Sequence, residues 1–251
     1  MKIIENSLSS IPRVPMDIDD LKDLPFIPIS PLPAKSFAML VCGAPGSGKT
    51  NLMMALLTSH STKKKFKPTY YFKFFDRIEF ISASIATLPN NFLKQLPDEQ
   101  KQNKFTDEIL VDLVENMSKG ENDNNLLVID DCIRDITRSK NLSKVYLNRR
   151  HITHNSEEDG NGGLSVITTS QKYSLMPLEF RNAQSDVIVF KSSNATEISR
   201  IRDELLFDLN KDQQEELFKM AWSEPYSFLY IKVNKPLKDK YYIKFDKVEF
   251  D

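Results

Sequence analysis

Apolar residues along this chain fall into short continuous runs and into longer segments with helical spacing. The continuous apolar run at 36–42, bounded by turn residues, predicts a strand buried on both faces. Further strands are predicted at 77–84 and, as buried strands, at 126–129, 164–170 and 186–190. Apolar residues with helical spacing predict a helix at 107–119. Further helices are predicted at about 48–60 and, as a polar helix, at 136–150, with two amphipathic helices near 197–206 and 212–222. Strands that alternate with helices predict an α/β fold, with a mostly parallel sheet covered by helices on both faces.

The two ends of the chain break this alternation. Two strands at 227–233 and 241–248 close it, and we expect them to pair antiparallel at an edge of the sheet. Six of the thirteen prolines precede Lys35, so this part can hold neither a long helix nor a central strand. We therefore predict an extended N-terminal arm over residues 1–35, with one helical turn near 17–23, and a single domain over residues 36–251. The arm is expected to lie on that domain or on a neighbouring subunit.

Composition supports a globular protein. At 251 residues, with 40% hydrophobic and 27% charged positions, the chain can bury a large core, and disordered, collagen-like and disulfide-scaffold classes are excluded. The net charge of −1 gives no general attraction to nucleic acid, so any such binding requires local basic patches. The longest strongly apolar stretch, at 37–42, is far too short for a membrane span, and the first residues carry no signal-peptide core. Two cysteines, Cys42 and Cys132, are too few for a metal site and favour a reducing cytoplasmic setting.

The strongest motif lies between the first buried strand and the first helix. Residues 43–50, GAPGSGKT, satisfy the phosphate-loop pattern G-x-x-x-x-G-K-[ST], and three of the seven glycines are within it. The backbone N–H groups of such a loop hold the β-phosphate, Lys49 bridges the β- and γ-phosphates, and the Thr50 hydroxyl ligates Mg²⁺. The predicted nucleotide contacts are Gly43, Ala44, Pro45, Gly46, Ser47, Gly48, Lys49, Thr50 and Asn51.

A second motif ends the strand at 126–129, where Asp130 and Asp131 follow the run LLVI. The carboxyl ends of parallel strands form the ligand-binding edge of an open α/β sheet. We expect Asp130 to hold Mg²⁺ through a water molecule and Asp131 to polarise the attacking water. The guanine signature N-K-x-D is absent from the sequence, which favours ATP over GTP.

Polar residues after the strand at 164–170 form a third motif. Gln171 follows Ser170 at the expected ligand-binding edge, where its side chain is placed to hydrogen-bond the γ-phosphate or the lytic water. The alternative is an ordinary polar residue that ends a strand.

Arginine is rare, with nine residues against twenty-five lysines, so its positions are informative. Arg149 and Arg150 end the helix after the two aspartates, and Arg181 follows the strand that ends at Ser170. A guanidinium is permanently charged and bidentate, which suits a finger inserted into a neighbouring subunit's γ-phosphate. For Arg149 and Arg150 the helix dipole is an equal explanation, and the choice between this pair and Arg181 stays open.

Two other segments have a plain explanation. Residues 63–73 mix lysines with aromatic rings, which could bind nucleic acid, but a solvated loop followed by core aromatics is the favoured interpretation. The acidic, glycine-rich segment 153–163 is taken as an insertion, with a moving loop near a ring's pore as the alternative.

The chain carries, in this order, GAPGSGKT, RIEFISAS, LLVIDD, RRH and VITTSQ, followed by Pro177 and Arg181. This order resembles that of the poxvirus-type DNA-packaging ATPases of large DNA viruses and virophages, which belong to the FtsK–HerA superfamily. The resemblance covers about residues 36–190 and implies a RecA-like core over the ATPase domain. On this match Lys49, Thr50, Asp130, Asp131 and Gln171 carry over, and Arg150 and Arg181 are the candidate fingers. The stretch between Arg150 and the strand at 164–170 is longer here than in the family by about ten residues.

The resemblance also implies partners and a setting. These are ATP and Mg²⁺, double-stranded DNA, a homo-oligomeric ring of five or six subunits, and capsid or portal-vertex proteins, at the viral assembly site in the host cytoplasm or with the virion. A stand-alone ATP-binding switch or scaffold that recruits partners through the proline-rich arm is the alternative. A small-molecule kinase is disfavoured, because no arginine-rich lid is evident in the sequence.

Overall fold

The computed structural model describes residues 2–4, 28, 30–59, 70–88, 93–94, 96–119, 124–152 and 163–250. The chain divides into two compact units. The first unit comprises Met1–Ile11, Met39–Lys49 and Ser170–Asp251, and the second comprises Pro12–Ala38 and Thr50–Thr169. The helical turn expected near residues 17–23, the lysines at 63–67 and the segment 153–162 lie outside the described residues.

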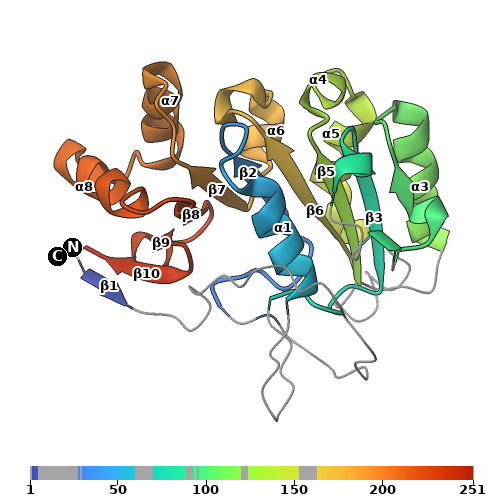
Figure 1. Cartoon of the computed structure of the whole chain (residues 1–251), viewed down its shortest axis with the longest axis horizontal. Helices are drawn as coiled ribbons and strands as arrows, with labels where there is room; N and C mark the ends of the chain where they lie inside the picture. The colour runs from blue at the N-terminus through green and yellow to red at the C-terminus, as the bar shows by residue number, and fades with distance from the viewer. Residues whose placement is uncertain are drawn as a thin grey trace, which may run out of the picture. The chain divides into compact units, whose positions relative to one another are not determined.

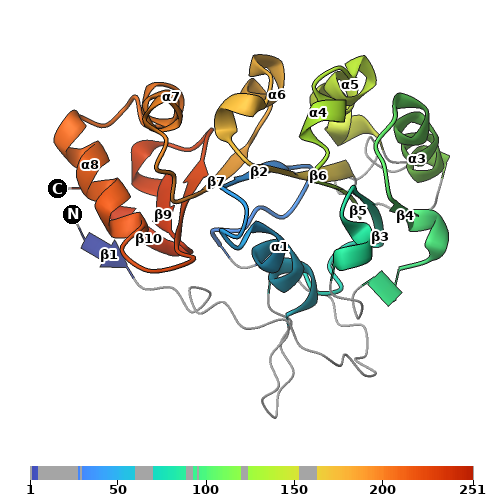
Figure 2. The same cartoon turned by 45° about the horizontal axis from the view of Figure 1, so that its top comes forward.

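The second unit is built on a parallel sheet in the strand order β6-β5-β3-β4. Its strands are β3 (Arg77–Ser82), β4 (Lys101–Gln102), β5 (Asn124–Asp130) and β6 (Gly163–Ser170). Its helices are α1 (Lys49–Thr58), which begins at the unit boundary, α3 (Asp107–Lys119), α4 (Ile133–Ile136) and α5 (Lys140–Asn148), with 3-10 turns at Ile85–Thr87, Asp98–Gln100 and Arg149–His151. Helix α1 covers one face of these strands, and α3, α4 and α5 cover the other (Figures 1 and 2).

Burial explains why the sequence predicted these elements well. All eight residues of β6 and six of the seven in β5 are buried, as expected for strands covered on both faces. Helix α3 buries Leu110, Leu113 and Met117, whose spacing places them on one side of a helix. The helix predicted at 107–119 is therefore confirmed.

The helix predicted over 136–150 is shorter than expected: it corresponds to α5, and only its first residue belongs to α4. Helix α4 ends at Ile136, a turn follows, and α5 begins after Ser139. The Ser139 backbone is extended, and its hydroxyl accepts a hydrogen bond from the Leu142 backbone N–H at 2.9 Å. Serine in this capping position satisfies a backbone donor at a new helix start, so the apolar spacing continues although the helix does not.

The first unit carries the strand order β2-β7-β8-β9-β10-β1. Its strands are β1 (Lys2–Ile4), β2 (Ala38–Cys42), β7 (Asp186–Phe190), β8 (Phe228–Lys232), β9 (Tyr241–Ile243) and β10 (Asp246–Glu249). Its helices are α6 (Leu178–Asn182), α7 (Ala195–Leu205) and α8 (Lys211–Ala221), with 3-10 turns at Tyr173–Leu175 and Leu237–Asp239. Strands β2 and β7 are parallel, and every later neighbour in this order is antiparallel.

The single strand predicted over 241–248 is wrong, because this segment is a hairpin of β9 and β10. The bend falls at Lys244, which has a φ of +54° in the left-handed region, and at Phe245, whose ring is buried. Strand β10 in turn pairs with β1 of the N-terminal arm, so both ends of the chain lie beside this edge (Figure 1). The start of the arm therefore lies on the same chain.

The two units confirm the predicted fold class. Parallel strands alternate with helices, and antiparallel strands form the C-terminal edge. Within the described residues, every helix is too short or too polar to span a bilayer.

Candidate active site

The phosphate loop joins β2 to α1 and depends on glycine for its backbone. Gly46 has a φ of +76° and Gly48 a φ of +104°, both in the left-handed region that side-chain-bearing residues rarely adopt. These conformations turn the chain sharply between the end of the strand and the start of the helix. The predicted loop is therefore present in the first unit with the geometry that its glycines require.

Close packing also fixes the first glycine of the loop. A Cβ added at Gly43 would lie 2.5 Å from the Ser47 Oγ and 2.8 Å from the Phe190 Cβ, so no side chain fits there. The Gly43 N–H donates to the Ser170 carbonyl at 3.1 Å, which ties the loop to the residue before Gln171. The Ser47 hydroxyl is buried and has no hydrogen-bond partner among the described residues. An unpaired hydroxyl inside a loop of this kind fits a site that is completed by an anionic ligand.

Lys49 reaches back across the loop. Its Nζ donates to the carbonyl oxygens of Gly43 at 2.6 Å and of Ala44 at 3.1 Å. The ammonium group is thereby held at the start of the loop. A bound phosphate would offer this cation a charged acceptor in place of neutral carbonyls, which is the stronger hydrogen bond.

A cavity of about 300 Å³ lies in the first unit beside the start of the loop. Its wall is formed by the segments 42–45, 171–172 and 189–194, together with Glu197. Lys172 and Lys191 line it with exposed side chains, so the cavity carries positive charge next to the phosphate loop. Burial raises the pKa of the Cys42 thiol, with Glu197 adding to the increase and Lys49 opposing it, so this thiol is a neutral part of the wall.

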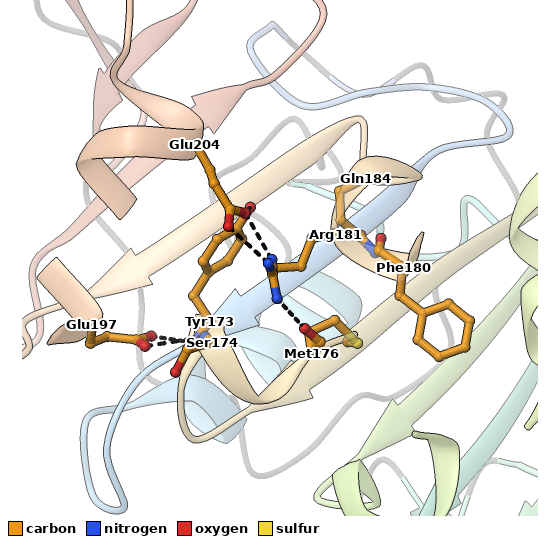
Figure 3. A network of polar contacts seen from close by, with 8 residues as sticks. All are labelled: Tyr173, Ser174, Met176, Phe180, Arg181, Gln184, Glu197 and Glu204. Atoms are coloured by element: carbon orange, nitrogen blue, oxygen red, sulfur yellow. Dashed lines mark hydrogen bonds and ion pairs between the residues drawn. The ribbon is translucent and has the colours of Figure 1, made fainter. Parts of the chain in front are cut away.

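Gln171 also lines this cavity, and the turn that follows it is firmly held. The Glu197 carboxylate accepts hydrogen bonds from the backbone N–H groups of Tyr173 and of Ser174, the latter at 3.1 Å (Figure 3). Glutamate Glu204, two turns further along α7, accepts from the Tyr173 hydroxyl at 2.9 Å. Helix α7 thus anchors the segment immediately after Gln171.

Asp130 and Asp131 lie together in the second unit. Asp130 is buried and accepts hydrogen bonds on both carboxylate oxygens, from the Ser82 hydroxyl at 3.0 Å and the Thr169 hydroxyl at 2.7 Å. The Asp131 N–H donates to the same Thr169 oxygen at 3.0 Å, and its side chain is exposed. Asp131 has a φ of +53°, an uncommon conformation for a residue other than glycine, and such strain gathers at functional sites.

Ser82 and Thr169 are site residues that the sequence did not identify. Each lies near the carboxyl end of its strand, and Ser82 is directly opposite Asp130 in the parallel pairing of β3 with β5. Polar residues at the ends of neighbouring parallel strands were the available signal. The sequence does not show which strands are neighbours in the sheet, so it could not place Ser82 and Thr169 beside Asp130.

The donor set fits a magnesium ion. Magnesium takes hard oxygen ligands, and in nucleotide sites one or two carboxylates and the substrate phosphates are sufficient. Thr50 in α1 supplies a hydroxyl, and Asp130 supplies a carboxylate whose orientation two hydroxyl groups fix. Within the described residues no group of three or more His, Cys, Asp or Glu side chains could hold a metal, so the phosphates would have to complete the site.

The candidate arginines differ sharply in their surroundings. Arg181 is 6% exposed and forms a two-pronged ion pair with Glu204, with Nε and Nη2 each 2.8 Å from a carboxylate oxygen (Figure 3). Its third nitrogen donates to the Met176 carbonyl. Arg149 donates to the carbonyl oxygens of Ser36 and Tyr146. Arg150 is exposed, and the described part of the chain offers its side chain no hydrogen bond or ion pair.

Comparisons with known proteins bear on the fold. Residues 31–147 match the family model of the nephrocystin 3 N-terminal region. A search of curated protein sequences found no match.

Among solved structures, the genome packaging NTPase B204 from Sulfolobus turreted icosahedral virus 2, in complex with AMPPCP, is 15% identical with a TM-score of 0.54, over 83% of this chain and 96% of that one. The B204 DNA-packaging ATPase from Sulfolobus turreted icosahedral virus is 15% identical over 83% of this chain and 97% of that one, with a TM-score of 0.48. A RuvB variant from Thermotoga maritima is 15% identical over 74% of this chain and 49% of that one, with a TM-score of 0.35. The likeness to the AMPPCP complex, together with the phosphate loop, shows that this chain has the fold of a P-loop NTPase.

Proposed function

We propose that this protein is an ATP-hydrolysing motor that moves double-stranded viral DNA into a preformed capsid. The observation that carries the proposal is the phosphate loop, with the Lys49 ammonium held across it, in a chain that shares its fold with a viral genome packaging NTPase over 83% of its length. The order of the phosphate loop, the Asp-Asp strand end and Gln171, which resembles the packaging ATPases, adds to it.

Binding of the triphosphate is assigned to the loop. The backbone N–H groups of Gly46, Gly48, Lys49 and Thr50 and the Ser47 hydroxyl receive the β-phosphate region, and Lys49 exchanges its carbonyl acceptors for phosphate oxygens. Thr50 and Asp130 would hold Mg²⁺, which neutralises charge on the phosphates when it is bound. Asn51 follows Thr50 in the first turn of α1, at the end of the nucleotide-contacting segment.

Hydrolysis is assigned to Asp131 and Gln171. The Asp131 carboxylate accepts a proton from the attacking water as the water oxygen bonds to the γ-phosphorus. The bond from that phosphorus to the bridging oxygen breaks, and the bridging oxygen leaves on ADP with its electron pair. The proton then passes from Asp131 to the released phosphate. Gln171 orients the water or the γ-phosphate through its amide, from a turn that Glu197 holds in place.

Arg150 is our candidate for the finger supplied to a neighbouring subunit. An arginine that acts in trans must present its guanidinium to solvent in the isolated chain, and Arg150 does so. Arg181 would have to break its ion pair with Glu204 before it could reach another subunit. The same proposal includes a ring of five or six copies with DNA in its centre, docked on a capsid or portal vertex. The ring would act at the viral assembly site in the host cytoplasm or with the virion.

ATP hydrolysis measured with and without double-stranded DNA, over a hundredfold range of protein concentration, tests this function. The motor predicts that activity per subunit rises with concentration and rises further with DNA, because catalysis needs a neighbour and the net charge of −1 gives one subunit little attraction to DNA. DNA binding should also weaken steeply between about 50 and 200 mM salt. If activity per subunit changes neither with dilution nor with DNA, the motor function is rejected and a stand-alone ATP switch is favoured.

A further inference from the structure

The turn that leads from α8 into β8 has an unusual residue at its tightest point. The Ser227 N–H donates to the Glu224 carbonyl at 3.3 Å, which closes a four-residue turn with Pro225 and Tyr226 in the middle. Tyr226 has a φ of +60°. Proline at the second position and a positive φ at the third are the features of a type II turn, in which the third residue is normally glycine or asparagine.

A tyrosine in this position lowers the stability of the fold. A bulky side chain in the left-handed region is a genuine outlier, and such residues persist where function requires them. Burial does not compensate for the strain, since Tyr226 is 70% exposed. An exposed aromatic ring, held rigidly by a strained backbone, is therefore a feature that folding alone does not explain.

The ring lies against the phosphate loop, within the first unit. A Cβ added at Gly48 would be 3.3 Å from the Tyr226 Cδ1, 3.8 Å from its Cβ and 3.5 Å from the Phe190 Cε1. Gly48 directly precedes Lys49, in the segment whose N–H groups receive the phosphates. The Tyr226 ring thus lies beside Gly48 in the phosphate loop, although Tyr226 is 70% exposed to solvent.

We propose that Tyr226 is the stacking platform for the base of the nucleotide whose phosphates lie in the loop. This proposal rests on the proposed function and specifies its substrate as a nucleoside triphosphate rather than an inorganic polyphosphate. Aromatic side chains bind bases through their faces, and such stacking tolerates any base because every base has a π-face. The platform therefore adds affinity for the base but contributes little to the choice between adenine and guanine.

The decisive measurement compares two ligands that share their phosphates. Titration calorimetry with AMPPCP and with inorganic tripolyphosphate, both with magnesium, is carried out on the wild-type protein, Tyr226→Ala and Tyr226→Phe. Loss of one base stack corresponds to a decrease in affinity of between about fivefold and a hundredfold. We expect that decrease for AMPPCP in Tyr226→Ala only, with Tyr226→Phe close to wild type and tripolyphosphate affinity the same in all three proteins.

A glycine variant separates binding from folding. Glycine is the residue that the turn favours, so Tyr226→Gly should raise the thermal midpoint while it lowers AMPPCP affinity as much as Tyr226→Ala does. A merely structural tyrosine would move both quantities in the same direction. Phe207→Ala is the matched control, because Phe207 is also 70% exposed but its ring contacts Lys240, so its loss should leave AMPPCP affinity unchanged.

The outcomes distinguish this inference from the proposed function. If Tyr226→Ala binds AMPPCP as tightly as the wild-type protein does, the platform is overturned and the NTPase assignment stays intact. The same conclusion follows if Tyr226→Ala loses equal affinity for AMPPCP and for tripolyphosphate. If the wild-type protein binds neither ligand, the proposed function itself fails. Equal affinities of the wild-type protein for AMPPCP and tripolyphosphate would also overturn the platform, since the base would then contribute nothing.

Discussion

Replacing Thr169 with valine removes one hydroxyl that serves both aspartates of the second unit. That hydroxyl donates to the Asp130 carboxylate at 2.7 Å and accepts from the Asp131 N–H at 3.0 Å. A hydrogen bond to a charged group contributes about 1.5–3 kcal/mol and a neutral one about 1 kcal/mol. Because valine has nearly the same shape and also suits a strand, Thr169→Val should lower the free energy of unfolding by roughly 2.5–4 kcal/mol through these two bonds.

Denaturant unfolding measures this loss, and the same strand provides a matched control. Ser165 is also buried in β6, but its hydroxyl has no hydrogen-bond partner among the described residues. Ser165→Ala should therefore not lower the free energy of unfolding, because it removes a buried hydroxyl that has no partner. Ser82→Ala removes the other bond to Asp130, together with the contacts of the Ser82 hydroxyl with the Ser84 hydroxyl and the Ser84 N–H, each at 3.2 Å, and should cost at least roughly 1.5–3 kcal/mol.

Catalysis provides the second part of this test. The Thr169 hydroxyl holds the backbone of Asp131 in its left-handed conformation, so Thr169→Val should lower kcat for ATP hydrolysis more than Ser82→Ala does. If Thr169→Val unfolds at the same denaturant concentration as Ser165→Ala, the two hydrogen bonds contribute nothing. Our account of how Asp130 and Asp131 are held would then be refuted.

Four further substitutions test the site. Lys49→Ala should abolish hydrolysis and most nucleotide binding, measured by phosphate release and calorimetry, and near-normal turnover would remove the site assignment. Asp131→Asn should keep ATP binding but stall hydrolysis, whereas a loss of binding equal to that of Lys49→Ala would make Asp131 a metal-site residue. Arg150→Ala should lower activity without lowering stability, and mixing it with Lys49→Ala subunits should restore part of it. Arg181→Ala should instead lower the free energy of unfolding by about 3 kcal/mol, because it removes the cation that is paired with the Glu204 carboxylate. The opposite pattern in the two arginine variants would exchange their roles.

The sequence predicted the elements that simple local rules determine. Strand β2 is a continuous apolar run, and every residue of β2, β6 and β7 is buried, so the apolar residues of these strands are visible in the sequence alone. The phosphate loop was predictable for a similar reason, since Gly46 and Gly48 occupy backbone conformations that few other residues tolerate.

The features that the sequence missed depend on residues that do not follow the usual preferences or on partners far along the chain. The bend between β9 and β10 falls on Lys244, which gives no turn signal although its φ is +54°. The hydroxyls that hold Asp130 come from residues 48 positions before it and 39 positions after it. Apolar spacing contains no information about which strands become neighbours, so neither contact could be predicted.

Helix α7 shows how such distant contacts bear on the proposed chemistry. Glu197 and Glu204 are seven residues apart, two turns of the helix, so both face the segment that follows Gln171. One fixes the backbone of Tyr173 and Ser174, and the other holds the Tyr173 hydroxyl and the Arg181 guanidinium (Figure 3). The buried Arg181 therefore suits a role in stiffening this turn, and the exposed Arg150 suits contact with a second subunit.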